Sequence, residues 1–442
     1  MGPPSSDAAS HGARVLPVVA TAPFGGTEQL TIEPTKPKIP ATTGPAKKVL
    51  ILSASAGAGH VRAADALLKV CQLHPRIGQV QHWDMLKYTS RFFRHMYHQV
   101  YLDLINKAPK MLGWLYDAFD TPWRREKMRL AFDKFNAGPF LKAAAAFQPD
   151  LIICTHFTPA ALMAWLYENG RWPVKPAIAV TDFDCHAMWL VRSYQHYFVA
   201  LEETRIHMAR LGIDAAAITV SGIPVDPAFQ EPKTAAAARR RLGLDSELFT
   251  ILVMAGGYGV GPVETLIEEL YRLRRPAQLV VVAGQGEALK LKLDQIVDRH
   301  NGQRPVRMVP VGYTTLMDEY MAAADLLISK PGGLTISEAL ARQLPLCIVN
   351  PIPGQEERNS DHLLEAGVAI RCNNVPALAW KLERLMDEPQ RLSAMRQNTL
   401  ALAHPDAAQR IVEVLAALPA PPAFTAPKSA LRRRLQLVRR PG

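Results

Sequence analysis

The sequence predicts an α/β protein with two doubly wound parallel sheets. Short β-branched runs alternate with helical patterns from Lys47 onward, and several of these runs are followed by glycine-rich turns. The alternation forms two series, separated by the Pro-bearing, Ala/Arg-rich residues 223–244. A length of 442 residues also exceeds one ordinary core, since domains average roughly 150 residues.

Apolar runs of strand length give the order of the elements. The first is 49–52, followed by a helical pattern over 61–70, and a helix is also expected over 262–273. The other predicted strands are 151–154, 177–181, 197–200 and 218–221 in the first series, and 250–254, 279–283, 306–311, 325–329 and 346–350 in the second. The predicted organisation is a flexible extension (1–46), a first domain (47–230), a second domain (245–418) and a basic tail (419–442).

Composition narrows the class of protein. A hydrophobic content of 48% with 21% charged residues is typical of globular proteins. No apolar run reaches the roughly 18 to 20 residues that a membrane-spanning helix needs. The five cysteines form no C-x-x-C pair, which argues against a disulfide framework or a structural zinc site. We therefore expect a cytoplasmic protein.

The net charge of +11 predicts an acidic partner, which can be nucleic acid, anionic lipid or a phosphate-bearing substrate. Residues 85–130 hold nine Lys or Arg against four Asp or Glu, together with nine aromatic residues. Such a mixture suits a membrane interface, or equally an amphipathic helical pair with its aromatic side chains in the core. The aromatic residues include Tyr88, Phe92, Phe93, Tyr97, Trp114 and Trp123. The arginine-rich tail is either a membrane contact or a solvated terminus.

The first glycine-rich turn, SAGAGH over 55–60, leads from a strand into a helix. This places His60 at the carboxyl edge of the first sheet, where open α/β domains bind ligands. Gly57 and Gly59 leave room beside the imidazole, so His60 is a candidate general base; the alternative is a histidine that caps or packs. An ordinary imidazole pKa near 6.5 would suit that role.

Two glycine turns of the second series are candidate phosphate sites. Gly257, Gly259 and Gly261 precede a predicted helix, although their spacing is not G-x-G-x-x-G and a tight βα turn is the alternative. The turn containing Lys330, Gly332 and Gly333 leads to Thr335 and Glu338. Lysine can meet a phosphate, and a carboxylate can accept hydrogen bonds from a ribose diol. Together these turns indicate a nucleotide-diphosphate substrate.

Two further segments carry polar candidates. Gln355 and Asn359 lie four residues apart, on one face of a predicted helix, and carboxamides suit sugar hydroxyls. The sequence TDFD over 181–184 contains a D-x-D, which is the manganese signature of one class of sugar transferases and also occurs by chance. We favour a positioning role for Asp182, with His186 and Trp189 following on the acceptor side.

Taken together, these motifs resemble the diacylglycerol glycosyltransferases related to monogalactosyldiacylglycerol synthases and processive diacylglycerol glucosyltransferases. The similarity covers about residues 47–374 and includes 55–60, the TDF segment with His186 and Trp189, 221–225, 256–261, KPGGLT from Lys330, and PGQE with Asn359. The resemblance implies a GT-B fold with two Rossmann-like domains facing a cleft, inverting transfer from a UDP-sugar to diacylglycerol, and no catalytic metal or other cofactor.

The same resemblance implies site roles. His60 would deprotonate the diacylglycerol hydroxyl, the turn over 257–261 would hold the diphosphate, and Glu338 would bind ribose. Tyr313 would contact uracil, and Gln355 with Asn359 would bind the donor sugar. The protein would then lie peripherally on an anionic membrane without binding nucleic acid. Alternatives are a UDP-N-acetylglucosamine transferase acting on a polyprenyl-linked peptidoglycan precursor, and a non-catalytic binder of anionic lipid or nucleic acid.

Overall fold

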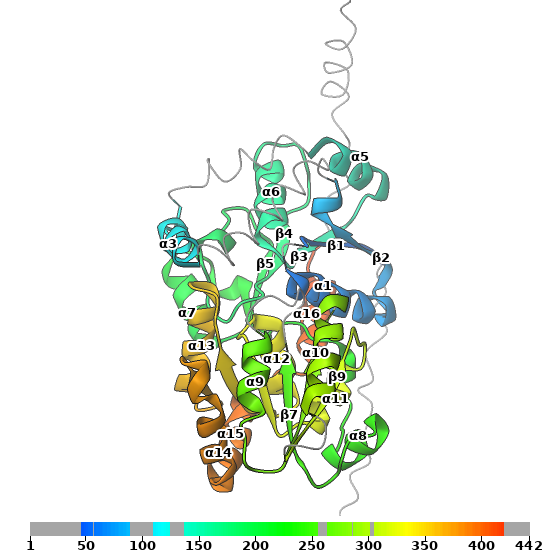
Figure 1. Cartoon of the computed structure of the whole chain (residues 1–442). Coiled ribbons are helices and arrows are strands. Elements are labelled where there is room, and N and C mark those ends of the chain that lie inside the picture. The colour runs from blue at the N-terminus through cyan, green and yellow to red at the C-terminus, as the bar shows by residue number, and fades with distance from the viewer. Residues whose placement is uncertain are drawn as a thin grey trace, which may run out of the picture. The chain divides into compact units, whose positions relative to one another are not determined.

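Two six-stranded sheets organise the protein, and every strand pairing in them is parallel (Figure 1). The computed structural model describes residues 46–55, 57–88, 109–123, 137–254, 263–284, 286–300 and 305–419. Each sheet is flanked by helices, as βαβ connections require. The predicted α/β class is confirmed.

The first sheet has the strand order β2-β1-β3-β4-β5-β6. We call this sheet and its connecting segments the first lobe. Its strands are β1 (Lys47–Ser53), β2 (Ile77–Asp84), β3 (Leu151–Cys154), β4 (Pro176–Ala179), β5 (His196–Val199) and β6 (Ile218–Val220). Its helices are α1 (Ala58–Leu73), α3 (Pro109–Phe119), α5 (Ala137–Phe147), α6 (Phe157–Glu168) and α7 (Glu202–Arg210), with short 3₁₀ turns η1 (Met85–Tyr88), η2 (Ala187–Trp189) and η3 (Ala215–Ala217).

The second sheet has the order β12-β11-β10-β7-β8-β9 and forms the second lobe with its helices. It is reached through η4 (Pro227–Gln230) and α8 (Ala235–Leu242). Its strands are β7 (Phe249–Met254), β8 (Ala277–Val282), β9 (Val306–Val311), β10 (Leu326–Ser329), β11 (Leu346–Val349) and β12 (Ala369–Cys372). Its helices are α9 (Val263–Leu270), α10 (Glu287–His300), α11 (Met317–Ala323), α12 (Gly333–Ala341), α13 (Gln355–Glu365), α14 (Leu378–Met386) and α15 (Pro389–Asn398), with η5 (Val375–Ala377) and η6 (Thr399–Ala401).

Each strand order reverses once, and that reversal marks where a doubly wound sheet binds ligands. In the first sheet the reversal lies between β1 and β3, so the segments after these strands, with His60 and Thr155, flank it. In the second sheet it lies between β7 and β10, and Lys330 follows β10. The segments that contain His60 and Lys330 therefore lie at the two switch points.

The last helix that the structure describes, α16 (Ala407–Ala417), packs against the first lobe. Helix α16 lies beside α1 (Figure 1). Its Ile411 and Leu415 pack into the same core as Val49 of β1 and Leu67 of α1. A second shared core contains Ala63, Phe183 and Ile223 of the first lobe together with second-lobe residues such as Leu334 and Ile348. The predicted boundaries at 230, 245 and 418 stay predictions, because these cores cross between the two sheets.

Strands β2 and β12 were not predicted from the sequence. In β2 only the end residues are well buried, so Ile77–Asp84 lacks the continuous apolar run that marks the central strands. The edge strand β12 is short and contains Arg371. Edge strands bury less side-chain area, which weakens their sequence signal.

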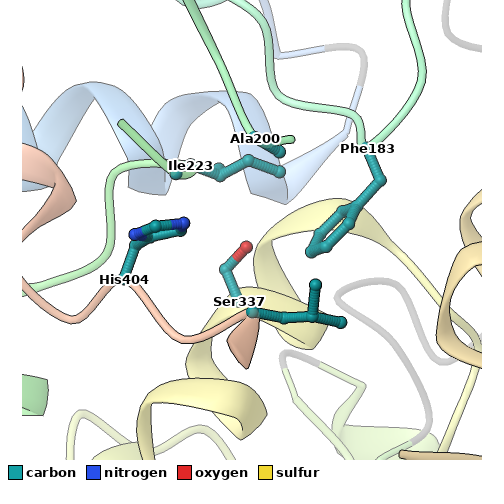
Figure 2. A pocket seen from close by; sticks show the side chains of 7 residues that line it. Phe183, Ala200, Ile223, Ser337 and His404 are labelled. Carbon is teal, nitrogen blue, oxygen red and sulfur yellow. The ribbon is translucent and has the colours of Figure 1, made fainter. Parts of the chain in front are cut away.

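A small cavity lies where first-lobe loops meet α12 and the chain leading into α16 (Figure 2). Its volume is about 10 Å³, and a water molecule needs about as much. At Gly222, whose φ is +83°, an added Cβ would lie 2.3 Å from Cβ of His404. This small cavity is a closely packed contact between the segments that line it, and it is too small to hold a sugar nucleotide. Its lining comprises Phe183, Ala200, Gly222, Ile223, Ser337, Leu402 and His404.

Candidate active site

His60 lies in the first turn of α1, which follows β1, and it contacts Thr155 after β3, so it lies at the switch point of the first sheet. Its Nδ1 is 3.1 Å from the carbonyl oxygen of Thr155 and 2.7 Å from Oγ1 of Thr181. Because a carbonyl only accepts, the Thr155 contact requires the hydrogen on Nδ1. Nε2 then carries the free lone pair, which is the atom that a general base uses.

The environment of His60 weakens it as a base. Burial lowers the pKa of His60 to about 4, and the hydrogen bond to the Thr155 carbonyl offsets this only in part. The expected pKa near 6.5 is therefore wrong, because sequence alone does not show how many protein atoms surround the ring. At pH 7 the imidazole is neutral, so the base form is fully populated.

The glycines around His60 leave space. An added Cβ at Gly57 would lie 4.0 Å from Cδ2 of His60, and one at Gly59 would lie 3.6 Å from Cβ of Leu334 on α12. Both are ordinary contacts. The start of α1 therefore approaches the second lobe closely without a steric demand for glycine at these two positions.

A second histidine, His156, faces His60 with its ring edge-on at 4.6 Å between centroids. It follows β3 and caps α6, and its Nδ1 accepts a hydrogen bond from the backbone N–H of Thr158 at 3.0 Å. Burial and the nearby His60 hold the pKa of His156 well below its usual range. Sequence analysis missed His156, because a lone histidine after a strand carries no distinguishing pattern.

The segment Thr181–Asp184 connects the first lobe to α13 of the second. A carboxylate oxygen of Asp182 accepts a hydrogen bond from the side-chain amide of Gln355. The backbone N–H of Phe183 donates to Oδ1 of Asn359 at 3.0 Å, and Arg358 pairs with Asp184 at 3.1 Å. The predicted sugar-binding residues are thus brought together with the segment that contacts His60.

Both carboxylates of the D-x-D are already engaged by protein donors. Asp182 also accepts from Nε1 of Trp189 at 3.2 Å, and Asp184 accepts from the backbone N–H of Cys185 at 2.7 Å. Burial raises the pKa of Asp182 to about 6, although its hydrogen bonds act in the opposite direction. Among the residues that the structure describes, no three His, Cys, Asp or Glu side chains cluster as metal ligands. The predicted positioning role of Asp182 fits these contacts.

The turn after β10 approaches the same segment. An added Cβ at Gly333 would lie 2.2 Å from the carbonyl oxygen of Thr181, so this position requires glycine. At Gly332 the nearest atom to an added Cβ is Oε1 of Glu356, at 3.7 Å. Lys330 and Thr335 flank this turn and are partly buried.

Glu338 on α12 is 1% exposed and pairs with Arg62 of α1. Its second carboxylate oxygen is buried without a hydrogen-bond partner among the described residues. Burial raises the pKa of Glu338, and the Arg62 guanidinium partly offsets the rise. A buried carboxylate with one free oxygen is suited to accept from a ligand hydroxyl.

Glu356 is a further carboxyl group that sequence analysis did not assign. Burial raises its pKa to about 7, whereas the N–H of Ile352, 2.7 Å from Oε2, and the charge of Lys330 favour ionisation. Acidic residues are common in the first turn of a helix, so Glu356 gave no separate signal in the sequence.

His186 and Trp189 are buried, at 2% and 1% exposure. His186 donates from Nε2 to the carbonyl of Tyr116 at 2.9 Å and accepts at Nδ1 from the N–H of Met188 at 3.1 Å. Both ring nitrogens of His186 are therefore hydrogen-bonded to the backbone, and Nε1 of Trp189 donates to Asp182. The acceptor-side role of these two residues stays a prediction, because the polar atoms of both side chains already have protein partners.

Within residues 85–130, some aromatic side chains pack against the core and Trp114 is exposed, so each of the two expected arrangements applies to part of the segment. Tyr88 and Trp123 pack against the core of the first lobe. Trp114 and Met111 of α3 are 68% and 50% exposed.

Tyr313, the predicted uracil contact, follows β9 and is 69% exposed. Several predicted residues lie outside the described residues, namely Gly257, Gly259, Gly261, Phe92, Phe93 and Tyr97.

Among the described residues, no helix is both long enough and apolar enough to cross a membrane.

Comparison with known proteins gives two family matches. Residues 60–225 match the model described as monogalactosyldiacylglycerol (MGDG) synthase, and residues 236–401 match glycosyl transferases group 1. A processive diacylglycerol beta-glucosyltransferase of Bacillus pumilus is 28% identical over 369 residues, covering 83% of this chain and 94% of that protein. The protein of that name from Bacillus subtilis is 28% identical over 371 residues, covering 83% and 94%. The resemblance inferred from the motifs is confirmed.

Solved structures support the fold. MurG of Acinetobacter baumannii superposes with a TM-score of 0.57 at 17% identity, covering 84% of this chain and 100% of MurG. A UDP-GlcNAc 2-epimerase of Neisseria meningitidis gives 0.52 at 14% identity, covering 84% and 100%. Because a transferase and an epimerase need not differ in fold, the sequence relatives carry the assignment. Residues 60–225 thus match the MGDG synthase family model and residues 236–401 match that of the group 1 glycosyl transferases, and the protein is a glycosyltransferase with a GT-B fold whose sequence relatives are named processive diacylglycerol beta-glucosyltransferase.

Proposed function

We propose that the protein transfers a hexose from a UDP-sugar to the hydroxyl of diacylglycerol, with inversion and with His60 as the general base. One observation carries the proposal. The segment Thr181–Asp184 contacts His60 through Thr181, and it contacts Gln355 and Asn359 through Asp182 and Phe183. The proposed base and the predicted donor-sugar residues therefore contact the same short segment, Thr181–Asp184. The relatives are named diacylglycerol glucosyltransferases, and these names suggest the acceptor class and the hexose.

The reaction is a single displacement. The acceptor oxygen forms a bond to the anomeric carbon while the bond from that carbon to the β-phosphate oxygen breaks, and UDP leaves with the electron pair. The hydroxyl proton moves to Nε2 of His60. The pKa of His60 is about 4, so the imidazole is a weak base. We therefore expect the proton to move late, after the bond between the anomeric carbon and the phosphate oxygen has largely broken, because the hydroxyl becomes more acidic as its oxygen bonds to the anomeric carbon.

The second lobe would bind the nucleotide. Lys330 and the N-terminal N–H groups of α12 offer positive charge for the diphosphate, and Glu338 offers its free oxygen to the ribose. Gln355 and Asn359 would bind the sugar, and the turn containing Gly257, Gly259 and Gly261 remains the predicted diphosphate loop. These charges make a metal-free reaction our expectation, testable by adding a chelator.

Helix α3 supports peripheral membrane attachment. Met111 and Trp114 lie three residues apart, on one helix face, and their exposed fractions are 50% and 68%. On the same helix Tyr116 packs against His186, with ring centroids 4.0 Å apart. An exposed Trp beside the candidate site suits the depth of lipid headgroups. We therefore place the acceptor lipid on the α3 side.

The test uses the full-length protein and diacylglycerol in anionic liposomes. UDP-glucose, UDP-galactose, UDP-glucuronate and UDP-N-acetylglucosamine are offered separately, and glycolipid is detected by mass spectrometry. We expect one hexose donor to give a β-linked product from the α-linked donor, with activity retained in EDTA. His60→Ala should lower kcat by about 10²- to 10⁴-fold while UDP binding, measured by calorimetry, persists.

Other outcomes would replace the proposal. Product formed only from UDP-N-acetylglucosamine and a polyprenyl-linked acceptor would assign the protein to precursor synthesis. Salt-sensitive binding to liposomes or DNA without UDP binding would indicate a non-catalytic binder. An α-linked product would contradict inversion.

A further inference from the structure

The ring of His60 is held by uncharged groups. Its Nδ1 contacts the Thr155 carbonyl and the Thr181 hydroxyl, and its ring faces those of His156 and Trp189, with centroids 4.6 and 6.5 Å away. Within the described parts of the chain, no Asp or Glu forms an ion pair with His60. The imidazole therefore lacks the carboxylate that commonly orients a catalytic histidine.

The three contacts define where each hydrogen lies. Nδ1–H donates to the Thr155 carbonyl, so the Thr181 hydroxyl, 2.7 Å from Nδ1, must accept from the same hydrogen. The Thr181 hydroxyl is then free to donate to the Thr155 carbonyl, 3.4 Å away. A proton on Nε2 instead would turn two lone pairs toward each other between Nδ1 and that carbonyl.

We infer that Thr181 is a positioning residue for His60. The Thr155 carbonyl keeps the proton on Nδ1, and the Thr181 oxygen, as a second acceptor for that proton, holds the ring with the lone pair of Nε2 toward the acceptor. The inference rests on the proposed function and adds a residue to it. When Nε2 takes the acceptor proton, the Thr181 oxygen and the Thr155 carbonyl stabilise the imidazolium through Nδ1–H. Thr181 thus does with a hydroxyl what a carboxylate does in a Ser-His-Asp triad.

The position of Thr181 in the chain adds a second function. Its carbonyl oxygen is the atom that makes glycine necessary at 333, at 2.2 Å from an added Cβ, and its neighbours Asp182 and Phe183 hold Gln355 and Asn359. The residue that orients the base therefore also lies against the start of α12. A shift of this segment moves the base and the donor-sugar residues together.

The experiment compares Thr181→Val with Thr181→Ser in the full-length protein. Valine keeps the shape and removes the hydroxyl, and we expect kcat to fall about 10- to 100-fold, the usual effect of losing a hydrogen bond to a charged group. The KM for the UDP-sugar should change less than about twofold. Thr181→Ser should restore most of the activity.

A second readout needs no substrate. ¹⁵N NMR of the histidine side chains, with His60→Ala to assign the signal, should show the Nδ1–H form in the native protein. Thr181→Val should keep this tautomer, because the Thr155 carbonyl remains, but should shift the Nδ1–H signal and lower the pKa of His60, because the imidazolium loses one of its two acceptors. Thr204→Val is the matched control, because Thr204 is also buried and donates to a carbonyl of the same segment, that of Phe183, at 2.5 Å. It should leave the pKa of His60 unchanged and lower kcat less than Thr181→Val does.

Distinct results separate the two proposals. If no donor gives product but the pKa of His60 still depends on Thr181, the proposed function fails and the positioning role stands. If Thr181→Val keeps the native kcat and the native pKa of His60, or lowers kcat no more than Thr204→Val does, the inference is wrong. Should Thr181→Val not fold, as judged by circular dichroism, Thr181→Ala replaces it with the same expectations.

Discussion

The two sides of the candidate site are held in opposite ways. In the first lobe, His60 is oriented by groups of its own lobe, the Thr155 carbonyl and the Thr181 hydroxyl. In the second lobe, Gln355, Asn359 and Glu338 are held by groups of the other lobe, namely Asp182, the N–H of Phe183 and Arg62. The proposed base is thus oriented within its own lobe, whereas the predicted donor-binding groups have protein partners in the other lobe.

This difference has an energetic consequence. A donor sugar that takes Gln355 or Asn359 exchanges one hydrogen bond for another, and such exchanges contribute little net free energy. Binding of the donor then competes with contacts between the lobes. We therefore expect changes in the first lobe's base to alter kcat, and changes at the contacts between lobes to alter stability and donor affinity together.

The largest expected effect is at Gly333. Gly333→Ala places a Cβ 2.2 Å from the carbonyl oxygen of Thr181 and 3.1 Å from Cδ1 of Ile223. A backbone atom cannot move aside cheaply, so we expect a loss of about 3 kcal/mol in the free energy of unfolding. Denaturant unfolding measures this loss, and calorimetry with UDP measures the accompanying fall in affinity.

Gly332→Ala is the matched control for that variant. Its added Cβ meets only Oε1 of Glu356, at 3.7 Å. We expect a change below about 1 kcal/mol in either direction, because removing a glycine also restricts the unfolded chain. Equal losses in the two variants would show that the Thr181 backbone does not approach α12 as described.

Opposite pH dependences separate the base from Asp182. Burial raises the pKa of Asp182 from 3.8 to about 6, so its contribution to stability is present below pH 4 and lost as the pH rises through 6. Burial lowers the pKa of His60 from 6.5 to about 4, so its contribution is present above pH 6.5 and lost as the pH falls through 4. The two effects partly cancel in the native protein.

Single variants should expose both slopes. Between pH 4 and 6.5, Asp182→Asn should gain stability relative to the native protein as the pH rises, and His60→Ala should lose it. Each change is about 3 kcal/mol, at about 1.4 kcal/mol per pKa unit. Urea unfolding at four pH values measures the slopes. Parallel curves for all three proteins would contradict the burial of these groups.

The sequence predicted the fold well because both sheets are parallel. Central strands such as 151–154 are buried on both faces, so they appear as continuous apolar runs. The edge strands β2 and β12 were missed because β2 buries only its end residues well, and β12 is short and contains Arg371. The return of α16 to β1 was not predictable either, because no local pattern encodes contacts between residues 350 positions apart.

The candidate site was predicted in part. The predicted place of His60, in a turn between a strand and a helix at the carboxyl edge of the first sheet, agrees with the structure, because a strand followed by a glycine turn and a helix is a local pattern. What sequence could not give were partners that come from distant segments. Thr181 beside His60 and Arg62 beside Glu338 became visible only in three dimensions, as did the low pKa of His60, which depends on the atoms around the ring.

A smaller effect is expected at the contact between Arg62 and Glu338. Arg62→Met leaves the carboxylate of Glu338 buried without its cation, while Arg62 itself is 40% exposed. We expect a loss of about 2 kcal/mol, less than for a fully buried pair. In a Glu338→Gln background the same change should cost under about 0.5 kcal/mol, and a double-mutant cycle measures the difference. Additive losses would mean that the two residues do not interact.

The smallest effect concerns the outer face of α3. Trp114 is 68% exposed there, and Trp380 on α14 of the second lobe is 56% exposed, so the two form a matched pair. Trp114→Ser should weaken binding to anionic liposomes about tenfold, near the 1.5 kcal/mol expected from burying part of a large apolar side chain. Trp380→Ser should not, because its ring lies beside Arg384 in the lobe that would hold the nucleotide. Liposome co-sedimentation at fixed salt measures both. Equal weakening by the two variants would mean that attachment is not confined to the first lobe, and the lipid would have to reach His60 by a route other than α3.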